Sequence, residues 1–150
     1  MDKHARILIV DDDENIRNTL KAILEDEGYV VDTAVTGAEA IQETQKTAYN
    51  IALLDIRLPD MEGVELLKLV KDSVPRMRKI MLTGYPTMQN AIAALNKNAD
   101  AYLIKPIEIE NLLATVRNQL KLQEGEREFS EQKVAEFIES RVKELSTQKT

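Results

Sequence analysis

Four short apolar segments of this chain are each followed by side chains that can do chemistry. Asp11 and Asp12 follow RILIV, Asp55 follows IALL, Thr83 follows KIML and Lys105 follows AYLI. If these segments are parallel strands of one sheet, the side chains beyond their carboxyl ends gather at one edge. Crowded carboxylates repel each other and resist ionisation. A hard cation bound only by oxygen atoms, such as Mg²⁺ or Mn²⁺, would relieve that repulsion, and the alternative is that Lys105 alone balances the acids.

This set of side chains favours phosphoryl chemistry. A carboxylate can act as a nucleophile and form an acyl phosphate, and phosphoryl transfer depends mainly on positioning and on neutralising the phosphoryl oxygens. We predict that Asp55 is the acceptor, that Asp11 and Asp12 hold the metal, and that Thr83 and Lys105 contact the phosphoryl group. The sequence has no glycine-rich phosphate loop, so the phosphoryl donor must come from outside. Each signal is weak alone, because acids after a strand often cap a helix.

The elements that would position these residues alternate between strands and helices. Strands are predicted at 6–10, 30–34, 51–54, 79–82 and 101–104, and helices at 14–27, 38–46, 64–71, 88–96 and from 108 onward. Gly28 suits the left-handed position that ends a helix, whereas Gly63 reads as an ordinary loop glycine. Repeated strand–helix units build a parallel sheet that helices cover on both sides. The predicted fold class is therefore α/β, with the more polar strand at 30–34 at an edge.

Composition narrows the class of protein. The 150 residues are 43% hydrophobic and 31% charged, carry a formal net charge of −6 and contain no cysteine. These values predict a globular protein without disulfides or thiolate metal sites. The negative charge argues against direct nucleic-acid binding, and no apolar run reaches the length of a membrane helix. We expect a cytoplasmic protein with no membrane partner.

The last residues differ in composition from the rest. We divide the chain into a domain at 5–122 and an appendage at 123–150, in which a polar linker (QEGERE) precedes an amphipathic helix. Val134, Ile138, Val142 and Leu145 fall on one stripe of that helix. The stripe could pair with a second copy, dock on another protein, or begin a further domain.

The motifs ILIVDDD, LLDIRLPDMEG, MLTGY and YLIKP, in this order and spacing, resemble the receiver domain of two-component response regulators. The resemblance covers roughly residues 5–122. It implies a flavodoxin-like, doubly wound five-stranded parallel sheet in the order 2-1-3-4-5, with the C-terminal helix as an addition. It also implies that a sensor histidine kinase or phosphotransfer protein phosphorylates Asp55, and that an unknown downstream protein reads the result.

The resemblance assigns further roles residue by residue. Asp12 and Asp55 would bind Mg²⁺ directly, Asp11 largely through water, and the backbone carbonyl of Arg57 would complete the protein ligands. Thr83 and Tyr102 would be the switch residues, and the Lys105-Pro106 peptide bond would be cis. Such a domain accepts phosphate and can release it again, but it is not expected to be an enzyme acting on other substrates.

Two other functions fit parts of the sequence. Asp11-x-Asp13 resembles the nucleophile motif of haloacid-dehalogenase phosphatases, although Asn15 stands where that motif usually has Thr or Val. A receiver-like scaffold that is never phosphorylated is the other alternative. Such degenerate members usually lack the acceptor or the lysine, and both are present here.

Overall fold

The computed structural model describes residues 5–70, 72–73, 75–84 and 99–148. The strands are β1 (Arg6–Val10), β2 (Val30–Ala34), β3 (Ile51–Asp55), β4 (Arg78–Thr83) and β5 (Ala101–Ile104). The helices are α1 (Glu14–Asp26), α2 (Gly37–Lys46), α3 (Gly63–Leu69) and α5 (Ile109–Gln148). The predicted boundaries of these elements agree within a few residues up to α5. The helix predicted at 88–96 lies outside the described residues.

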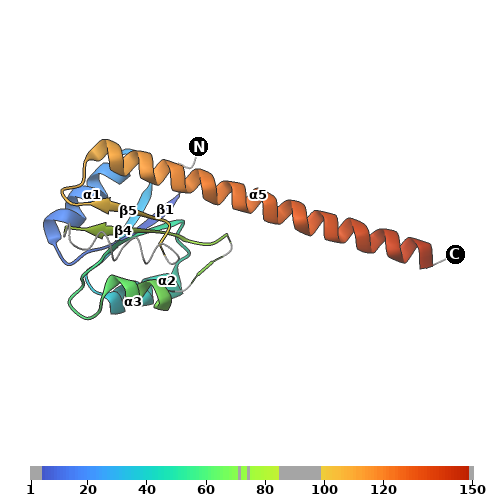
Figure 1. The fold of residues 1–150 in the computed structure, drawn as a ribbon, viewed down its shortest axis with the longest axis horizontal. Coiled ribbons are helices and arrows are strands. Elements are labelled where there is room, and N and C mark those ends of the chain that lie inside the picture. The colour runs from blue at the N-terminus through green and yellow to red at the C-terminus, as the bar shows by residue number, and fades with distance from the viewer. Residues whose placement is uncertain (1–4, 71, 74, 85–98, 149–150) are drawn as a thin grey trace.

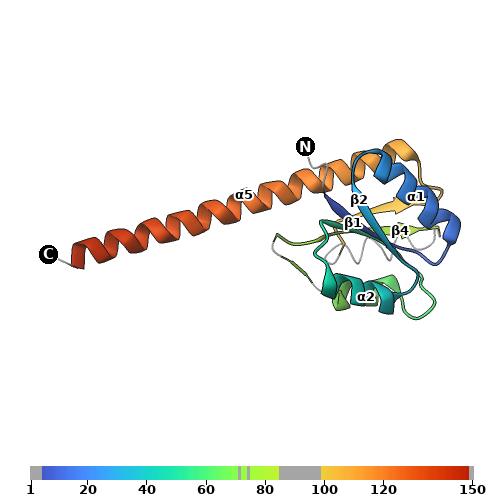
Figure 2. The ribbon, with the colours of Figure 1, turned by 180° about the vertical axis from the view of Figure 1, so that it is seen from behind.

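The five strands form one parallel sheet in the order β2-β1-β3-β4-β5, as the family resemblance implied. Strand β2 is an edge strand, as its polarity predicted. Figure 1 shows α1 and the first turns of α5 on one face of the sheet and α2 and α3 on the other, and Figure 2 shows the same layers from behind. This covering explains why β1 and β3 are apolar almost throughout, since a strand buried on both faces has no side exposed to water.

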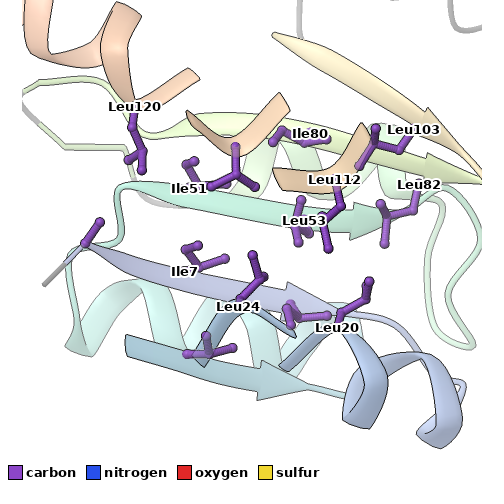
Figure 3. Packing of buried hydrophobic residues seen from close by; sticks show 14 residues of the cluster. Ile7, Leu20, Leu24, Ile51, Leu53, Ile80, Leu82, Leu103, Leu112 and Leu120 are labelled. Carbon is purple, nitrogen blue, oxygen red and sulfur yellow. The ribbon is translucent and has the colours of Figure 1, made fainter. Parts of the chain in front are cut away.

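Two apolar clusters hold the layers together. One lies between the sheet and the α1/α5 layer (Figure 3), where Leu20, Leu24, Leu112 and Leu120 meet side chains of the strands. The other lies under α2 and α3 and includes Leu54, Leu66 and Met81. Alternate residues of β1, β3 and β4 enter opposite clusters, because successive side chains of a strand point to opposite faces.

Local signals set the ends of the first helices. The Asp13 carboxylate accepts hydrogen bonds from the backbone N–H groups of Asn15 and Ile16 and caps α1. Gly28, with a φ of 97°, follows the end of the same helix in the predicted left-handed conformation. Thr36 caps α2 in the same way through its hydroxyl group.

The prediction of a polar linker from residue 123 was wrong. Helix α5 continues through Gln123 and Gly125 without a break and extends far beyond the sheet (Figure 1). The Gln123 side chain is buried and bonds to Asn50 and to the carbonyl oxygen of Arg76. These contacts anchor the helix where its sequence turns polar, and they outweigh the cost of about 1 kcal/mol for a glycine in a helix. The division at residue 122 stays a prediction.

A cluster of ion pairs reinforces this anchor. Arg78 contacts Asp100 at 3.2 Å and Glu126 at 2.5 Å, and Arg76 contacts Asp100 at 2.6 Å. Burial raises the pKa of Asp100, but the hydrogen bonds from Arg76 and from the Lys79 N–H outweigh it, so the net pKa lies below the usual range. The cluster joins the start of β4 to α5 as far as Glu126. Beyond it, residues 127–147 are all exposed.

No helix in the described part of the chain is long and apolar enough to cross a membrane.

Candidate functional site

Three carboxylates meet beyond the carboxyl ends of β1 and β3. Asp11, Asp12 and Asp55 each offer an oxygen, and these oxygens all lie within 4.8 Å of one another. Asp11 is fully buried, Asp55 is 7% exposed and Asp12 is exposed. The register explains their meeting, because Val10 pairs with Leu54 and both acids follow that pair. The structure therefore brings together the acids that the sequence selected.

Lys105 lies against this acidic cluster. Its Nζ is 2.9 Å from Asp11 Oδ2 and 3.5 Å from Asp55 Oδ1. Burial lowers the pKa of Lys105, but the hydrogen bond to Asp11 and the charge of Asp55 outweigh that effect, so its pKa is raised. Lys105 directly follows the end of β5, and its backbone N–H donates to the carbonyl oxygen of Thr83, the last residue of β4, at 2.6 Å. This bond holds Lys105 at the same edge of the sheet as the carboxylates. The Lys105-Pro106 peptide bond is cis, which confirms that prediction.

The electrostatics of Asp55 show that its negative charge is incompletely balanced. Burial and the nearby charge of Asp11 raise its pKa to about 6, although Lys105 acts in the opposite direction. The ammonium group of Lys105 thus contacts two carboxylates of a cluster of three. The same carboxylates line a hollow of about 420 Å³, together with Arg57, Gly84 and Lys105. Clustered oxygen ligands, excess negative charge and an open hollow together fit a small hard cation.

Thr83 and Tyr102 occupy different environments. Thr83 is the last residue of β4 and is fully buried, one position beyond Leu82, the register partner of Asp55. Tyr102 lies on the edge strand β5 and is 47% exposed. Thr83 therefore lies at the same edge of the sheet as the carboxylates, whereas Tyr102 presents much of its surface to solvent.

The loop after β3 folds back on Asp55. The Gly63 N–H donates to the Ile56 carbonyl oxygen at 2.8 Å, and Arg57 pairs with Glu62 in a short antiparallel bridge. A methyl group on Gly63 would overlap the carbonyl oxygen of Asp55. The interpretation of Gly63 as an ordinary loop glycine was wrong, because only a residue without a side chain allows this close approach.

Two further residues that bond to the backbone of the surrounding loops carried no recognisable signal in the sequence. Asp60 accepts hydrogen bonds from the N–H groups of Gly37 and Ala38, at 2.9 and 3.0 Å, and so ties the loop after β3 to the start of α2. These two bonds lower the pKa of Asp60. Arg17 donates to the carbonyl oxygen of Asp11 at 2.9 Å. The Asp60 contacts do not follow from local spacing, since they join residues more than twenty positions apart.

The geometry speaks against the phosphatase alternative. In that interpretation Asp11 is the nucleophile and Asp13 assists it. Asp11 is instead fully buried and paired with Lys105, and the Asp13 carboxylate caps α1. The more accessible of the two buried acids is Asp55.

Comparisons with known proteins agree with this geometry. Residues 7–117 match the family described as the response regulator receiver domain. The transcriptional regulatory protein ZraR of Escherichia coli is 35% identical over 114 residues, which are 76% of this chain and 26% of ZraR. TrcR of Mycobacterium tuberculosis, also a transcriptional regulatory protein, is 35% identical over 116 residues, 77% of this chain and 45% of TrcR. The chain thus spans between a quarter and a half of the length of these two relatives.

Solved structures show the same fold. A CheY-like receiver domain protein from Methanospirillum hungatei superimposes with a TM-score of 0.73 and 46% identity, over 82% of this chain and 98% of that one. NtrX from Brucella abortus superimposes with a TM-score of 0.77 and 30% identity, over 84% of this chain and 29% of NtrX.

Proposed function

This chain belongs to the response regulator receiver domain family, and we propose that the carboxylate of Asp55 is its phosphoryl acceptor. The observation that carries the proposal is the convergence of Asp11, Asp12, Asp55 and Lys105 around one hollow. In the reaction, a carboxylate oxygen of Asp55 forms a bond to phosphorus while the bond from phosphorus to the histidine nitrogen of the donor breaks. The departing imidazole then takes a proton from solvent.

We propose that Asp11, Asp12 and Asp55 hold Mg²⁺ or Mn²⁺, with the backbone carbonyl of Arg57 as the fourth protein ligand. The cation would supply positive charge to the phosphoryl oxygens during transfer. The raised pKa of Asp55 supports this assignment, because a carboxylate that resists ionisation alone is stabilised by a nearby cation. The loop from Ile56 to Gly63, folded back on Asp55, fixes the backbone of Arg57 beside the hollow.

Lys105 and Thr83 have complementary roles in the proposal. The ammonium group of Lys105 already lies 3.5 Å from Asp55 and can contact a phosphoryl oxygen after a small movement. The Thr83 hydroxyl would donate a hydrogen bond to the same group. We propose Thr83 and Tyr102 as the switch, in which phosphorylation draws Thr83 toward the site and Tyr102 turns inward. Such a switch is a population shift driven by the added negative charge.

The partners follow from this chemistry. The donor is a sensor histidine kinase or a phosphotransfer protein, and the output is a protein whose binding changes when the switch turns. The curated relatives are transcriptional regulatory proteins that are two to four times longer than the matched region. The formal net charge of −6 disfavours contact with DNA, so we propose that this region acts through protein contacts. One protein contact that we propose is a homodimer, formed through the exposed part of α5 in two copies of the chain.

Intact mass spectrometry after incubation with acetyl phosphate and Mg²⁺ tests the proposal. We expect one phosphoryl adduct on the wild-type protein and none on Asp55→Asn or in the presence of EDTA. Asp13→Asn serves as the matched control, because it removes a neighbouring carboxylate outside the metal cluster and should retain the adduct. An adduct that persists in Asp55→Asn would refute the assignment, and no adduct on any variant would support the scaffold alternative.

A further inference from the structure

The exposed part of α5 carries an apolar stripe that no other described residue covers. Its members are 53–66% exposed and comprise Val134, Phe137, Ile138, Val142 and Leu145. Together they present roughly 500 Å² of apolar surface. This area is larger than that of isolated apolar residues on a protein surface, and it is close to the area of patches that bind partners. We call residues 127–148 the arm. At about 1.5 Å per residue, the arm is roughly 33 Å long.

The stripe repeats the spacing of the part of α5 that packs on the sheet. Leu112, Val116, Leu120 and Gln123 are all buried and are spaced by four, four and three residues. Val134, Ile138, Val142 and Leu145 have the same spacing, 22 residues later. At about 100° per residue, 22 residues are six turns plus roughly 40°. The stripe therefore lies on nearly the same side of α5 as the sheet.

Most of the stripe is also symmetric along its length. Four of its five positions mirror about a point between residues 139 and 140, so that Val134 corresponds to Leu145 and Phe137 to Val142, while Ile138 corresponds to Arg141. A surface that meets its own copy across a two-fold axis must be complementary to itself. A mirrored spacing provides this complementarity when two helices run in opposite directions. This property favours a second copy of the chain over an unrelated occupant.

The stripe and the sheet lie on nearly the same side of α5, and this decides whether two arms can pair in a parallel or an antiparallel orientation. In a parallel pair, each stripe would face the two-fold axis, and each receiver would lie on that same side. Each receiver would then occupy the space of the other copy's helix. In an antiparallel pair the receivers lie at opposite ends, and each stripe meets the other without obstruction. The contacts of the buried Gln123 and of Glu126 keep this orientation, because they hold α5 to the sheet up to the start of the arm.

We propose that two copies of this chain pair through their arms in an antiparallel orientation, with the receivers at opposite ends. Pairing would cover about 1,000 Å² of apolar surface, and the polar flanks bring the total to the lower end of specific interfaces, about 1,200 Å². The inference deepens the homodimer proposed above. It does not depend on phosphoryl transfer to Asp55.

Spin labelling distinguishes the two orientations, and the absence of cysteine makes a single site easy to label. A label on Glu128→Cys lies about 120° from the stripe and leaves it intact. The antiparallel pair places the two labels about 35 Å apart along the arms, whereas a parallel pair places them within ~20 Å. A long distance measured by double electron–electron resonance supports the proposal. A short one refutes the antiparallel orientation and leaves pairing itself standing.

Sedimentation of the full chain tests pairing itself. Val142→Glu places a charge in the stripe, opposite Phe137 of the second copy, and should convert the dimer to a monomer. Ser140→Glu adds the same charge on the outer side of the arm, two residues away, and should leave the dimer unchanged. Circular dichroism checks that both variants remain folded. A wild-type protein that is monomeric at the concentration of the spin-label sample, or a dimer that survives Val142→Glu, overturns the proposal, whatever the result of phosphorylation at Asp55.

Discussion

Replacing Asp55 by Asn should stabilise the metal-free protein. Burial and the charge of Asp11 raise the pKa of Asp55 from 3.8 to about 6, so at neutral pH the folded state holds an ionised group that it disfavours. The difference corresponds to roughly 3 kcal/mol, since one pKa unit is about 1.4 kcal/mol. Asn keeps the shape of the side chain without the charge. We therefore expect Asp55→Asn to raise the free energy of unfolding by about 1–3 kcal/mol near pH 7.5.

The pH dependence of this gain has a definite sign. As the pH falls through about 6, the folded wild-type protein takes up a proton at Asp55 while the unfolded chain stays ionised down to about 4. The wild-type protein is stabilised relative to Asp55→Asn over this window. The advantage of the variant should thus be complete above about pH 6 and disappear toward pH 4.

Urea denaturation in EDTA, at several pH values, measures the effect. Glu139→Gln is the control, because it removes a carboxylate from the exposed arm and should change stability little at any pH. Adding Mg²⁺ should narrow or reverse the difference, because a bound cation stabilises the folded state and Asp55→Asn lacks one of the carboxylates that we propose as metal ligands. A variant that is less stable at neutral pH without metal, or whose advantage does not depend on pH, would contradict this prediction.

Three further substitutions probe the surroundings of Asp55. Lys105→Ala leaves the fully buried Asp11 without its 2.9 Å partner, so we expect a loss of about 2–4 kcal/mol in urea denaturation and at least a tenfold slower reaction with acetyl phosphate. Gly63→Ala forces a methyl group against the backbone of Asp55 and should cost about 1–3 kcal/mol, with weaker Mn²⁺ binding measured by electron paramagnetic resonance. Gly125→Ala meets no atom within 4 Å and should raise the thermal midpoint, because alanine gains about 0.5–1 kcal/mol over glycine in a helix. A midpoint that falls in Gly125→Ala, or metal binding unchanged in Gly63→Ala, would contradict these accounts.

Much of the fold could be predicted from the sequence because the signals are local. The apolar segments that become β1 and β3, the cap at Asp13 and the left-handed Gly28 each depend on neighbouring residues. The candidate site could be predicted for a related reason. In a parallel sheet, residues that follow the strands reach the same edge whatever the loops between them, so Asp11, Asp55 and Lys105 meet.

Other features depend on contacts between residues far apart in the chain, and only the tertiary structure decided them. The polar run after Leu122 resembles a linker until Gln123 is seen buried against Asn50, and that contact makes α5 one continuous helix. The close approach of Gly63 to Asp55 likewise appears only after the loop has folded back. By itself, the sequence determined which polar side chains follow the strands and so meet at the candidate site, because apolar periodicity and strand ends are local features of the chain. The tertiary structure decided their electrostatics and the direction of the arm, because both depend on which distant groups exclude water and on which face of α5 the sheet already occupies.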